Sequence, residues 1–333
     1  MAEPDPSAAA DKAAFPGSES WSDLTLLGLD IGGTTSRAWL WAAGTVVAES
    51  RAPSASLPAS GRDGARAALA ELLAGVRADE AAPLDAIGVG SAGLSVPGAR
   101  EFLREQLAPL TRSGALVIVA DAMLVLPAAG LDAGVAVVCG TGSVAVGSLA
   151  GRSVQAGGWG YLLGDEGGGY WIVREAIRTL LSRRDNCQPA GELGARLLSA
   201  TGAAGLPALH RLFYARPHRP GDWARHAGVV LDSPDIDAVA IASRAADAVA
   251  GLTESAIRKL DAPFNLPVVL AGGLLGNAAF RHLARNSVAQ VRPGADVRVL
   301  TAEPVAGAVR LAALAARRDG ERPPSATGDP GGR

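Results

Sequence analysis

The chain has 333 residues but only two lysines, Lys12 and Lys259, and two cysteines, Cys139 and Cys187. A P-loop requires a lysine directly after its glycines, so the lysine-free stretch between Lys12 and Lys259 excludes that type of phosphate site. The two cysteines fit neither a zinc motif nor a disulfide framework, and we therefore expect a protein of the reducing cytoplasm.

Membrane segments and strong net charge are also missing. No uninterrupted apolar run approaches the roughly 20 residues that a membrane helix needs, and the N-terminus does not resemble a signal peptide. The net charge of -2 argues against a nucleic-acid or membrane-surface partner. Because 48% of the residues are hydrophobic, a chain of this length can form about two domains with substantial cores.

Strands and helices alternate between polar ends at 1–22 and 318–333, which we expect to be disordered. The sequence predicts a strand, a glycine-rich turn and two further strands from residue 25. The same series is predicted again from residue 135. The repeat predicts an α/β protein with two similar lobes, at 23–132 and 133–317, and a cleft between them. The second lobe carries a helical insertion, and the last helix, at 304–316, could pack back on the first lobe.

Two glycine-rich turns occupy matching places in the predicted lobes. Residues 30–36 read Asp-Ile-Gly-Gly-Thr-Thr-Ser, and residues 139–143 read Cys-Gly-Thr-Gly-Ser. One such turn is common in hairpins, but a matched pair offers backbone N–H groups and hydroxyls suited to a polyphosphate. In a dinucleotide-binding fingerprint a helix follows the glycines, whereas here a strand follows Gly33. A dinucleotide site of that type is therefore excluded. The predicted phosphate contacts are Gly32, Gly33, Thr34, Thr35, Gly140, Thr141, Gly142 and Ser143.

A third turn, in residues 268–277, joins a buried strand to a helix. Glycines at 272 and 273 leave room for a flat group to lie against the backbone, which suits adenosine. We therefore assign Gly272, Gly273 and Asn277 to the ATP site. An ordinary strand–helix turn remains the alternative.

Two aspartates follow predicted strands. Asp121 ends the buried strand at 116–120, and ligands of α/β sheets gather at such carboxyl ends. A hydroxyl that attacks a phosphoryl group must lose its proton, so we assign Asp121 as the general base, with a helix N-cap as the alternative. Asp30 is the candidate organiser of Mg²⁺, through water, and its alternative role is to stabilise the turn.

The three turns resemble the phosphate-1, phosphate-2 and adenosine motifs of the actin/sugar-kinase/Hsp70 superfamily, whose fold pairs two ribonuclease-H-like lobes. Residues 157–172, GGWGYLLGDEGGGYWI, are similar to the hallmark of the BadF/BadG/BcrA/BcrD ATPase family, N-acetylglucosamine kinase branch. The resemblance spans roughly residues 24–317. It implies a kinase that uses ATP and Mg²⁺ to phosphorylate an amino sugar, with Asp121 as base. A homodimer is also possible.

The resemblance further implies a sugar pocket lined by Gly158, Trp159 and Asp165, where the indole offers a flat apolar wall. For Asp165, helix capping is the alternative. Ala92 and Gly93 border the pocket. Related kinases often have Asn in the loop after the third strand, but residues 52–57 read Ala-Pro-Ser-Ala-Ser-Leu. Ser54 or Ser56 is expected to substitute, which leaves N-acetylglucosamine, glucosamine and N-acetylmuramic acid open.

Two other functions use the same fold. An ATPase that activates a dehydratase through a shared iron–sulfur cluster would need suitably placed cysteines, and Cys139 lies in a phosphate turn. A non-catalytic sugar sensor would not require Asp121. The retained aspartate and the Gly-Gly-Trp-Gly segment favour the kinase.

Overall fold

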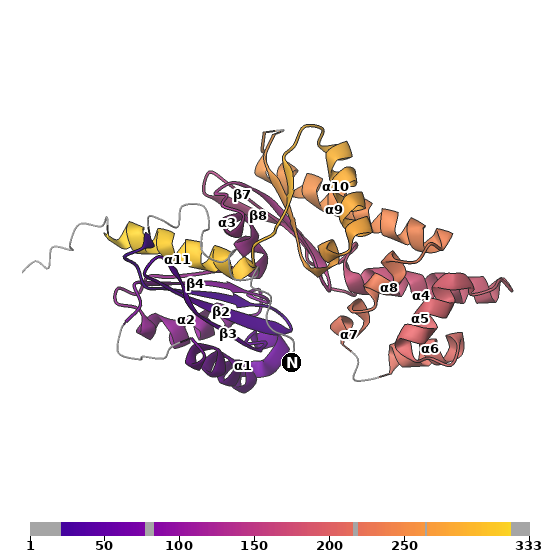
Figure 1. The fold of residues 1–333 in the computed structure, drawn as a ribbon, viewed down its shortest axis with the longest axis horizontal. Helices are drawn as coiled ribbons and strands as arrows, with labels where there is room; N and C mark the ends of the chain where they lie inside the picture. The colour runs from indigo at the N-terminus through magenta and orange to yellow at the C-terminus, as the bar shows by residue number, and fades with distance from the viewer. Residues whose placement is uncertain (1–20, 77–82, 216–218, 264, 321–333) are drawn as a thin grey trace, which may run out of the picture. The chain divides into compact units, whose positions relative to one another are not determined.

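The computed structural model describes residues 21–76, 83–215, 219–263 and 265–320 (Figure 1). It divides into two compact units. The first contains the described residues up to Gly130 and those from Ala302 onwards, and the second is Leu131–Thr301. Each unit contains one five-stranded mixed sheet, so the predicted α/β class is confirmed.

The first sheet has the strand order β3-β2-β1-β4-β5. The hairpin strands are antiparallel, whereas β1, β4 and β5 are parallel. The strands are β1 (Leu26–Ile31), β2 (Thr35–Ala42), β3 (Thr45–Pro53), β4 (Ala86–Ser91) and β5 (Leu116–Ala120). The helices are α1 (Leu57–Ala74), α2 (Ala99–Leu107), η3 (Ala108–Leu110), η4 (Asp121–Leu124), α3 (Val125–Ala128) and α11 (Pro304–Gly320).

Successive side chains of β1 point to opposite faces of the sheet and pack in two different hydrophobic cores, as expected for a sheet that is covered on both faces. Leu27 and Leu29 pack with α1 and α2 on one face, and Leu26 packs with α11 on the other. The helical spacing of apolar residues predicts a helix at 62–77, whereas α1 begins at Leu57 and has non-helical angles at Gly61 (φ 67°, ψ 175°). The periodic part of the helix follows this kink.

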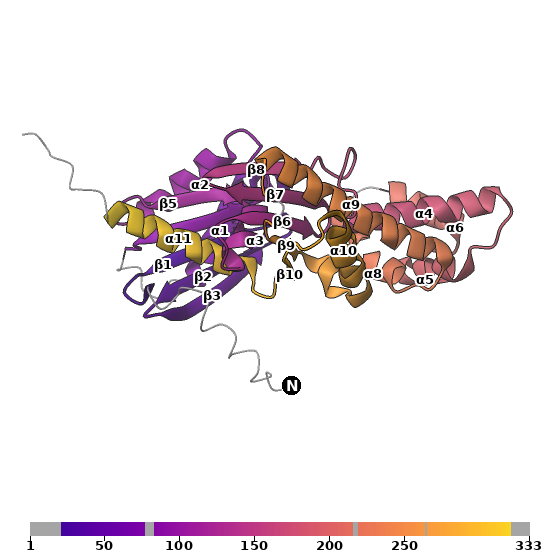
Figure 2. The same ribbon diagram turned by 90° about the horizontal axis from the view of Figure 1, so that it is seen from above.

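The last helix, α11, lies along the first sheet, as Figures 1 and 2 show. Gly28 of β1 and Gly88 of β4 are paired in register, and a Cβ atom on either would collide with α11 at Val309 or Ala308. Glycine in both strands therefore allows the helix to approach the backbone closely. The chain end from Ala302 thus belongs to the first unit and not to the second.

The second sheet has the order β10-β9-β6-β7-β8, which repeats the arrangement of the first. In each sheet a central strand pairs with a hairpin on one side and with two parallel strands on the other, so the duplication is confirmed. The strands are β6 (Gly134–Cys139), β7 (Ser143–Leu149), β8 (Arg152–Gly157), β9 (Val268–Ala271) and β10 (Val297–Val299).

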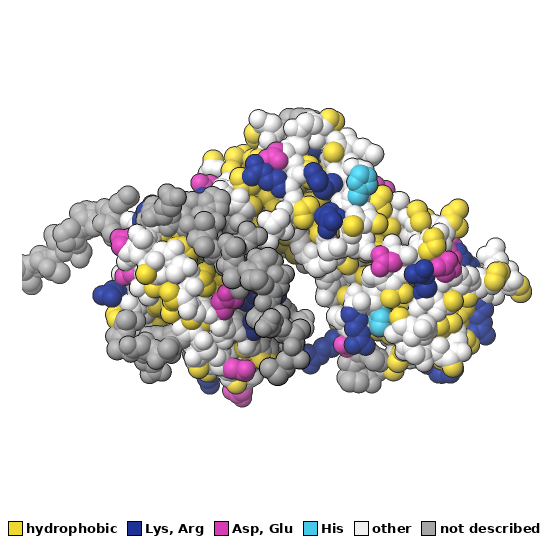
Figure 3. Space-filling view, viewed as in Figure 1, with side chains coloured by type: hydrophobic (Ala, Val, Ile, Leu, Met, Phe, Trp, Pro, Cys, Tyr) yellow, Lys and Arg dark blue, Asp and Glu magenta, His cyan; other side chains and the backbone are white. Residues whose placement is uncertain are grey.

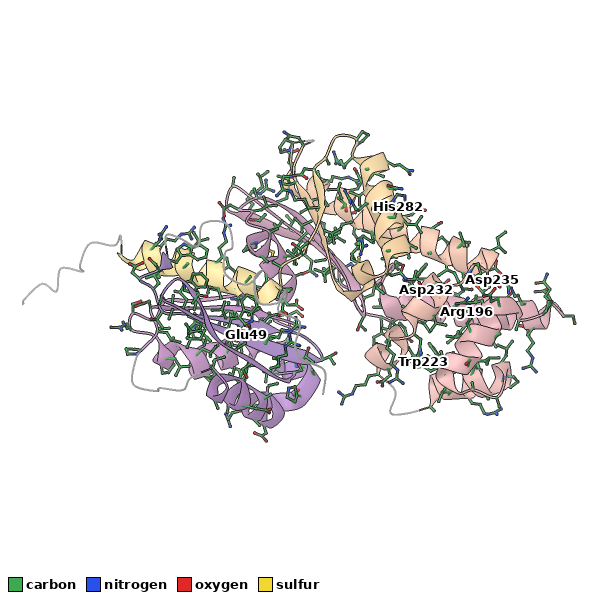
Figure 4. The ribbon with its side chains drawn as sticks, in the orientation of Figure 1. Glu49, Arg196, Trp223, Asp232, Asp235 and His282 are labelled. Carbon is green, nitrogen blue, oxygen red and sulfur yellow. The ribbon has the colours of Figure 1, made fainter. Side chains whose placement is uncertain are left out.

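Helices fill the segment between β8 and β9 of the second unit. They are α4 (Gly169–Asp185), α5 (Gly191–Thr201), α6 (Leu206–Tyr214), α7 (Pro220–Ala224), α8 (Ala227–Leu231) and α9 (Ile236–Leu260), and η5 (Gly273–Gly276) and α10 (Ala278–Val291) follow β9. The long helix α9 packs on β7 and β8, where Leu260 lies against Gly147 and Leu252 lies against Gly157. Arg183 of α4 joins it by an ion pair with Asp235, labelled in Figure 4.

No helix among the described residues has both the length and the apolar character needed to cross a membrane.

Candidate active site

The two predicted catalytic carboxylates lie at one edge of the first sheet. The parallel register places Ile31, Ser91 and Ala120 in one row across β1, β4 and β5, so Asp30 and Asp121 flank this row. Burial, and next the charge of Asp121, raises the pKa of Asp30 to about 6. Two acidic side chains from distant parts of the sequence are therefore neighbours within one unit.

Asp121 is the first residue of η4, directly after β5. Its Oδ1 accepts a hydrogen bond from the backbone N–H of the adjacent residue, Ala122, at 2.9 Å, but the N-cap of this 3₁₀ turn is Ala120 and not Asp121. Burial raises the pKa of Asp121, and the hydrogen bond from Ala122 opposes this effect. A carboxyl group with a raised pKa at a strand end suits a proton acceptor.

The first glycine turn is a tight hairpin between β1 and β2. The N–H of Gly32 donates to the carbonyl of Thr35 at 3.0 Å, and Gly33, Thr34 and Thr35 are exposed. Their backbone and hydroxyl groups are therefore available to a ligand. The hydroxyl of Ser54 donates to the carbonyl of Gly32 at 2.7 Å and fastens the turn from the β3–α1 loop.

The two serines predicted as sugar contacts are both buried. Ser54 holds the glycine turn, and the hydroxyl of Ser56 donates to the carbonyl of Ala92 at 3.0 Å. Ala92 and Gly93 follow β4, and the N–H of Ala92 donates to Ile31 at 2.8 Å. The serines thus connect the loop after β4 with the turn after β1, which gives them a positioning role.

The second glycine turn, between β6 and β7, is fastened by α4. The N–H groups of Gly169 and Tyr170, at the start of that helix, donate to the carbonyls of Gly140 at 2.9 Å and Thr141 at 3.0 Å. The buried hydroxyl of Ser143 donates to the carbonyl of Glu166 at 2.7 Å. The turn therefore presents its remaining groups from a rigid base.

Asp165 connects this turn to the loop that carries Trp159. A Cβ atom at Gly142 would overlap the Asp165 carboxylate, so glycine is required for this close contact. Burial raises the pKa of Asp165, whereas hydrogen bonds from the N–H groups of Gly160 and Ser143 lower it. The carboxylate predicted to bind sugar thus also holds the phosphate turn and the pocket loop together.

The loop that follows Gly158 exposes apolar side chains. Trp159 is 73% exposed, and Leu162 and Leu163 are 73% and 85% exposed. Large apolar side chains grouped in an exposed loop indicate a surface that binds a ligand or partner. The indole of Trp159 is accessible to a sugar face, as its predicted role requires.

The third turn lies next to the second turn within the same sheet. Strands β6 and β9 are parallel, with Val138 paired to Ala271, and a Cβ atom at Gly272 would collide with the backbone of Cys139. Asn277 caps α10 by accepting from the N–H of Phe280 at 2.9 Å. The turn is therefore also the ordinary strand–helix connection that was the alternative, in addition to its place beside the phosphate turn.

A cavity of about 730 Å³ opens beside the third turn and α10. Gly276, Arg281 and Arg285 are among its lining residues, and Arg281 donates to the carbonyl of Leu275 at 2.8 Å. His282, which Figure 4 labels on α10, lines a neighbouring hollow together with the same two arginines, and Figure 3 shows basic side chains gathered on this face. Sequence reasoning missed these arginines, although their i, i+4 spacing places them on one helix face.

The carboxyl pair fits Mg²⁺ better than it fits a transition metal. Among the described residues, no three His, Cys, Asp or Glu side chains gather in a metal-binding group. Mg²⁺ keeps several waters and takes only one or two carboxylates from the protein, beside substrate phosphates. Asp30 supplies an oxygen ligand of this kind, and the carboxyl group of Asp121 lies close enough to raise its pKa.

The fold and the turns define the class of protein. The chain has the α/β fold of the actin- and hexokinase-type ATPases, with one ribonuclease-H-like sheet in each unit. Residues 27–315 match the BadF/BadG/BcrA/BcrD ATPase family, and the chain belongs to this family.

Similar proteins include kinases of amino sugars. The chain is 37% identical over 103 residues to the N-acetylmuramic acid/N-acetylglucosamine kinase of Clostridium acetobutylicum, covering 30% of this chain and 33% of that protein. It is 30% identical over 189 residues to the N-acetyl-D-glucosamine kinase of Dictyostelium discoideum, covering 54% and 59%. The chain thus spans less than two thirds of either relative.

A crystal structure of a candidate N-acetylglucosamine kinase from Chromobacterium violaceum is similar over a longer span. The TM-score is 0.68 at 28% identity, and the match covers 86% of this chain and 98% of that one.

Proposed function

We propose that this protein is an ATP-dependent kinase that transfers the γ-phosphoryl group of ATP to the 6-hydroxyl of an amino sugar. The observation that carries this proposal is the pair of buried carboxyl groups, Asp30 and Asp121, at the ends of β1 and β5. Such a pair provides a base for the hydroxyl and an anchor for the cation that phosphoryl transfer needs. The names of the relatives support an N-acetylated hexosamine as the substrate.

Each residue has a defined task in this proposal. Asp121 accepts the proton of the sugar hydroxyl as that oxygen attacks in line. The exposed backbone groups of the two glycine turns bind the phosphates, and the third turn takes the adenosine. Asp30 would hold Mg²⁺ through water, and the bound cation would offset phosphate charge. Gly158, Trp159 and Asp165 form the sugar side of the site, with Ala92 and Gly93 at its border.

The activator ATPase is the weaker alternative. Cys139 is fully buried in the second glycine turn, and burial raises the pKa of its thiol to about 12, which disfavours the thiolate that a cluster needs. A cytoplasmic location remains our proposal from the cysteine content, and a homodimer from the family resemblance.

An ADP-release screen tests the proposed function. The purified protein with ATP and Mg²⁺ is offered N-acetylglucosamine, glucosamine, N-acetylmuramic acid and, as control, glucose. We expect ADP release well above the sugar-free rate with at least one amino sugar, and a 6-phosphate product by NMR. ADP release that no sugar stimulates would contradict the kinase and favour the ATPase.

Replacing Asp165 with Asn should raise the KM for both ATP and the sugar by about tenfold, the scale of losing a hydrogen bond to a charged group. The amide is uncharged and has one acceptor oxygen where the carboxylate has two, so its hydrogen bonds with the N–H groups of Gly160 and Ser143 are weaker. Steady-state kinetics of both substrates measure the effect. Glu166→Gln changes an exposed neighbour and is the matched control. An increase in the KM for sugar alone would show that Asp165 contacts sugar without holding the turn.

A further inference from the structure

A row of charged residues crosses the first sheet beside the proposed metal anchor. Asp30 of β1 is directly opposite Arg37 of β2, which is directly opposite Arg51 of β3. Directly opposed residues of antiparallel strands point to the same face, so the three side chains share one face of the sheet. Asp30 therefore has a permanent cation as its nearest neighbour across the ladder.

Glu303, immediately before α11, reaches both arginines. Its Oε2 lies 3.6 Å from Nη1 of Arg37, and its Oε1 lies 3.4 Å from Nη2 of Arg51. The Oε2 atom is buried and has no hydrogen-bond partner within the described residues, so the Arg37 ion pair is its compensation. All members of this group belong to the first unit.

The ion pairs of this group join Glu303 to the two arginines, and within the described residues none of them includes Asp30. Among the described residues, Arg37 pairs with Glu303 and makes no ion pair with Asp30, although its charge lowers the pKa of Asp30. An arginine that turned to Asp30 could bind the carboxylate through two hydrogen bonds and neutralise it. A carboxylate occupied in this way is a poor ligand for a hard cation.

We propose that Glu303 is a positioning residue that holds the Arg37 guanidinium away from Asp30 and so keeps the Asp30 carboxylate open to Mg²⁺. This inference rests on the proposed function, because it takes Asp30 as the Mg²⁺ anchor. It assigns a task to Glu303 and Arg37, which are distant in sequence. The proposed role depends on the ion pair between these two residues, because an Arg37 without this partner could turn to Asp30.

Glu303→Gln tests the inference, because it removes the charge that holds Arg37. The released guanidinium turns to Asp30, and the Mg²⁺ concentration for half-maximal turnover rises by about tenfold, the factor given by ~1.4 kcal/mol of competition. The Mg²⁺ concentration that gives half of the thermal stabilisation by ADP rises in parallel, without any turnover. Adding Arg37→Met to Glu303→Gln restores both values, because the competing cation is gone.

Arg51→Gln is the matched control. It removes the other ion pair of Glu303 but leaves Arg37 paired, and it should change both Mg²⁺ values by less than about twofold, as exposed ion pairs contribute little. An unchanged Glu303→Gln variant, or a double variant worse than the single, overturns the positioning role while wild-type Mg²⁺ dependence still supports the kinase. A wild-type protein with no Mg²⁺ response overturns both.

Discussion

Replacing Asp121 with Asn should lower kcat by a factor of about 10²–10⁴, the usual contribution of a general base. The amide has nearly the size of the carboxyl group, and its oxygen can still accept from the N–H of Ala122. The fold and the KM for ATP should therefore be retained. Steady-state ADP release with the best amino sugar from the screen measures the loss.

Asp85→Asn is the matched control for this variant. Asp85 precedes β4, at the opposite edge of the same sheet, where its carboxylate accepts from the N–H of Thr25 at 2.7 Å. Its turnover should remain near that of the wild type. Comparable kcat values for wild type and Asp121→Asn would remove Asp121 from its assigned role.

The pH profile gives a second readout of the same variant. The base must be ionised, so wild-type activity should fall as the pH drops through the pKa of Asp121. Burial raises this pKa, which moves the acid limb above the ordinary range of aspartate. The Asp121→Asn variant should not show the decrease in activity at low pH that protonation of Asp121 causes in the wild type.

Gly272→Ala should reduce the free energy of unfolding by about 2–3 kcal/mol, through backbone strain and overpacking together. Gly272 has φ +105°, which side chains rarely adopt, and its Cβ would collide with the backbone of Cys139. Urea denaturation measures the loss. The residual folded protein should also bind ATP more weakly, since the displaced backbone belongs to the second glycine turn.

Gly273→Ala provides the control at the next position. Its Cβ would meet nothing within 4 Å, and its φ lies outside the left-handed region. We expect a change within about 0.5 kcal/mol, as for most substitutions away from tight contacts. Equal stability of the two variants would show that the turn relaxes around the added methyl group and that the contact with Cys139 is not essential.

Sequence patterns were sufficient for the local elements and their repetition. The apolar run before Gly32 and that before Gly140 each predict a strand and a hairpin, and both occur in the structure. The order of the strands repeats for the same reason, because each lobe encodes the same alternation of apolar segments and turns. Long helices such as α9 were also predicted, since a periodic apolar face persists over many turns.

The tasks of individual polar residues were harder to predict. Ser54 and Ser56 were candidates for binding sugar, but their hydroxyls donate to Gly32 and Ala92. A serine hydroxyl can donate to a ligand or to a backbone carbonyl, and only the folded chain shows which of the two it contacts. Asn277 was likewise a candidate for binding ATP, and the folded chain shows that its side chain caps α10.

The sequence by itself determined the fold class, the two matched glycine turns and the aspartates at strand ends, because these depend on short-range periodicity and backbone freedom. The sequence left open whether the last helix packs on the first lobe, and only the tertiary structure decided that α11 covers the first sheet and that Glu303 meets Arg51 across 252 residues. Long-range ion pairs depend on which surfaces come together in packing, and no spacing along the chain encodes that pairing.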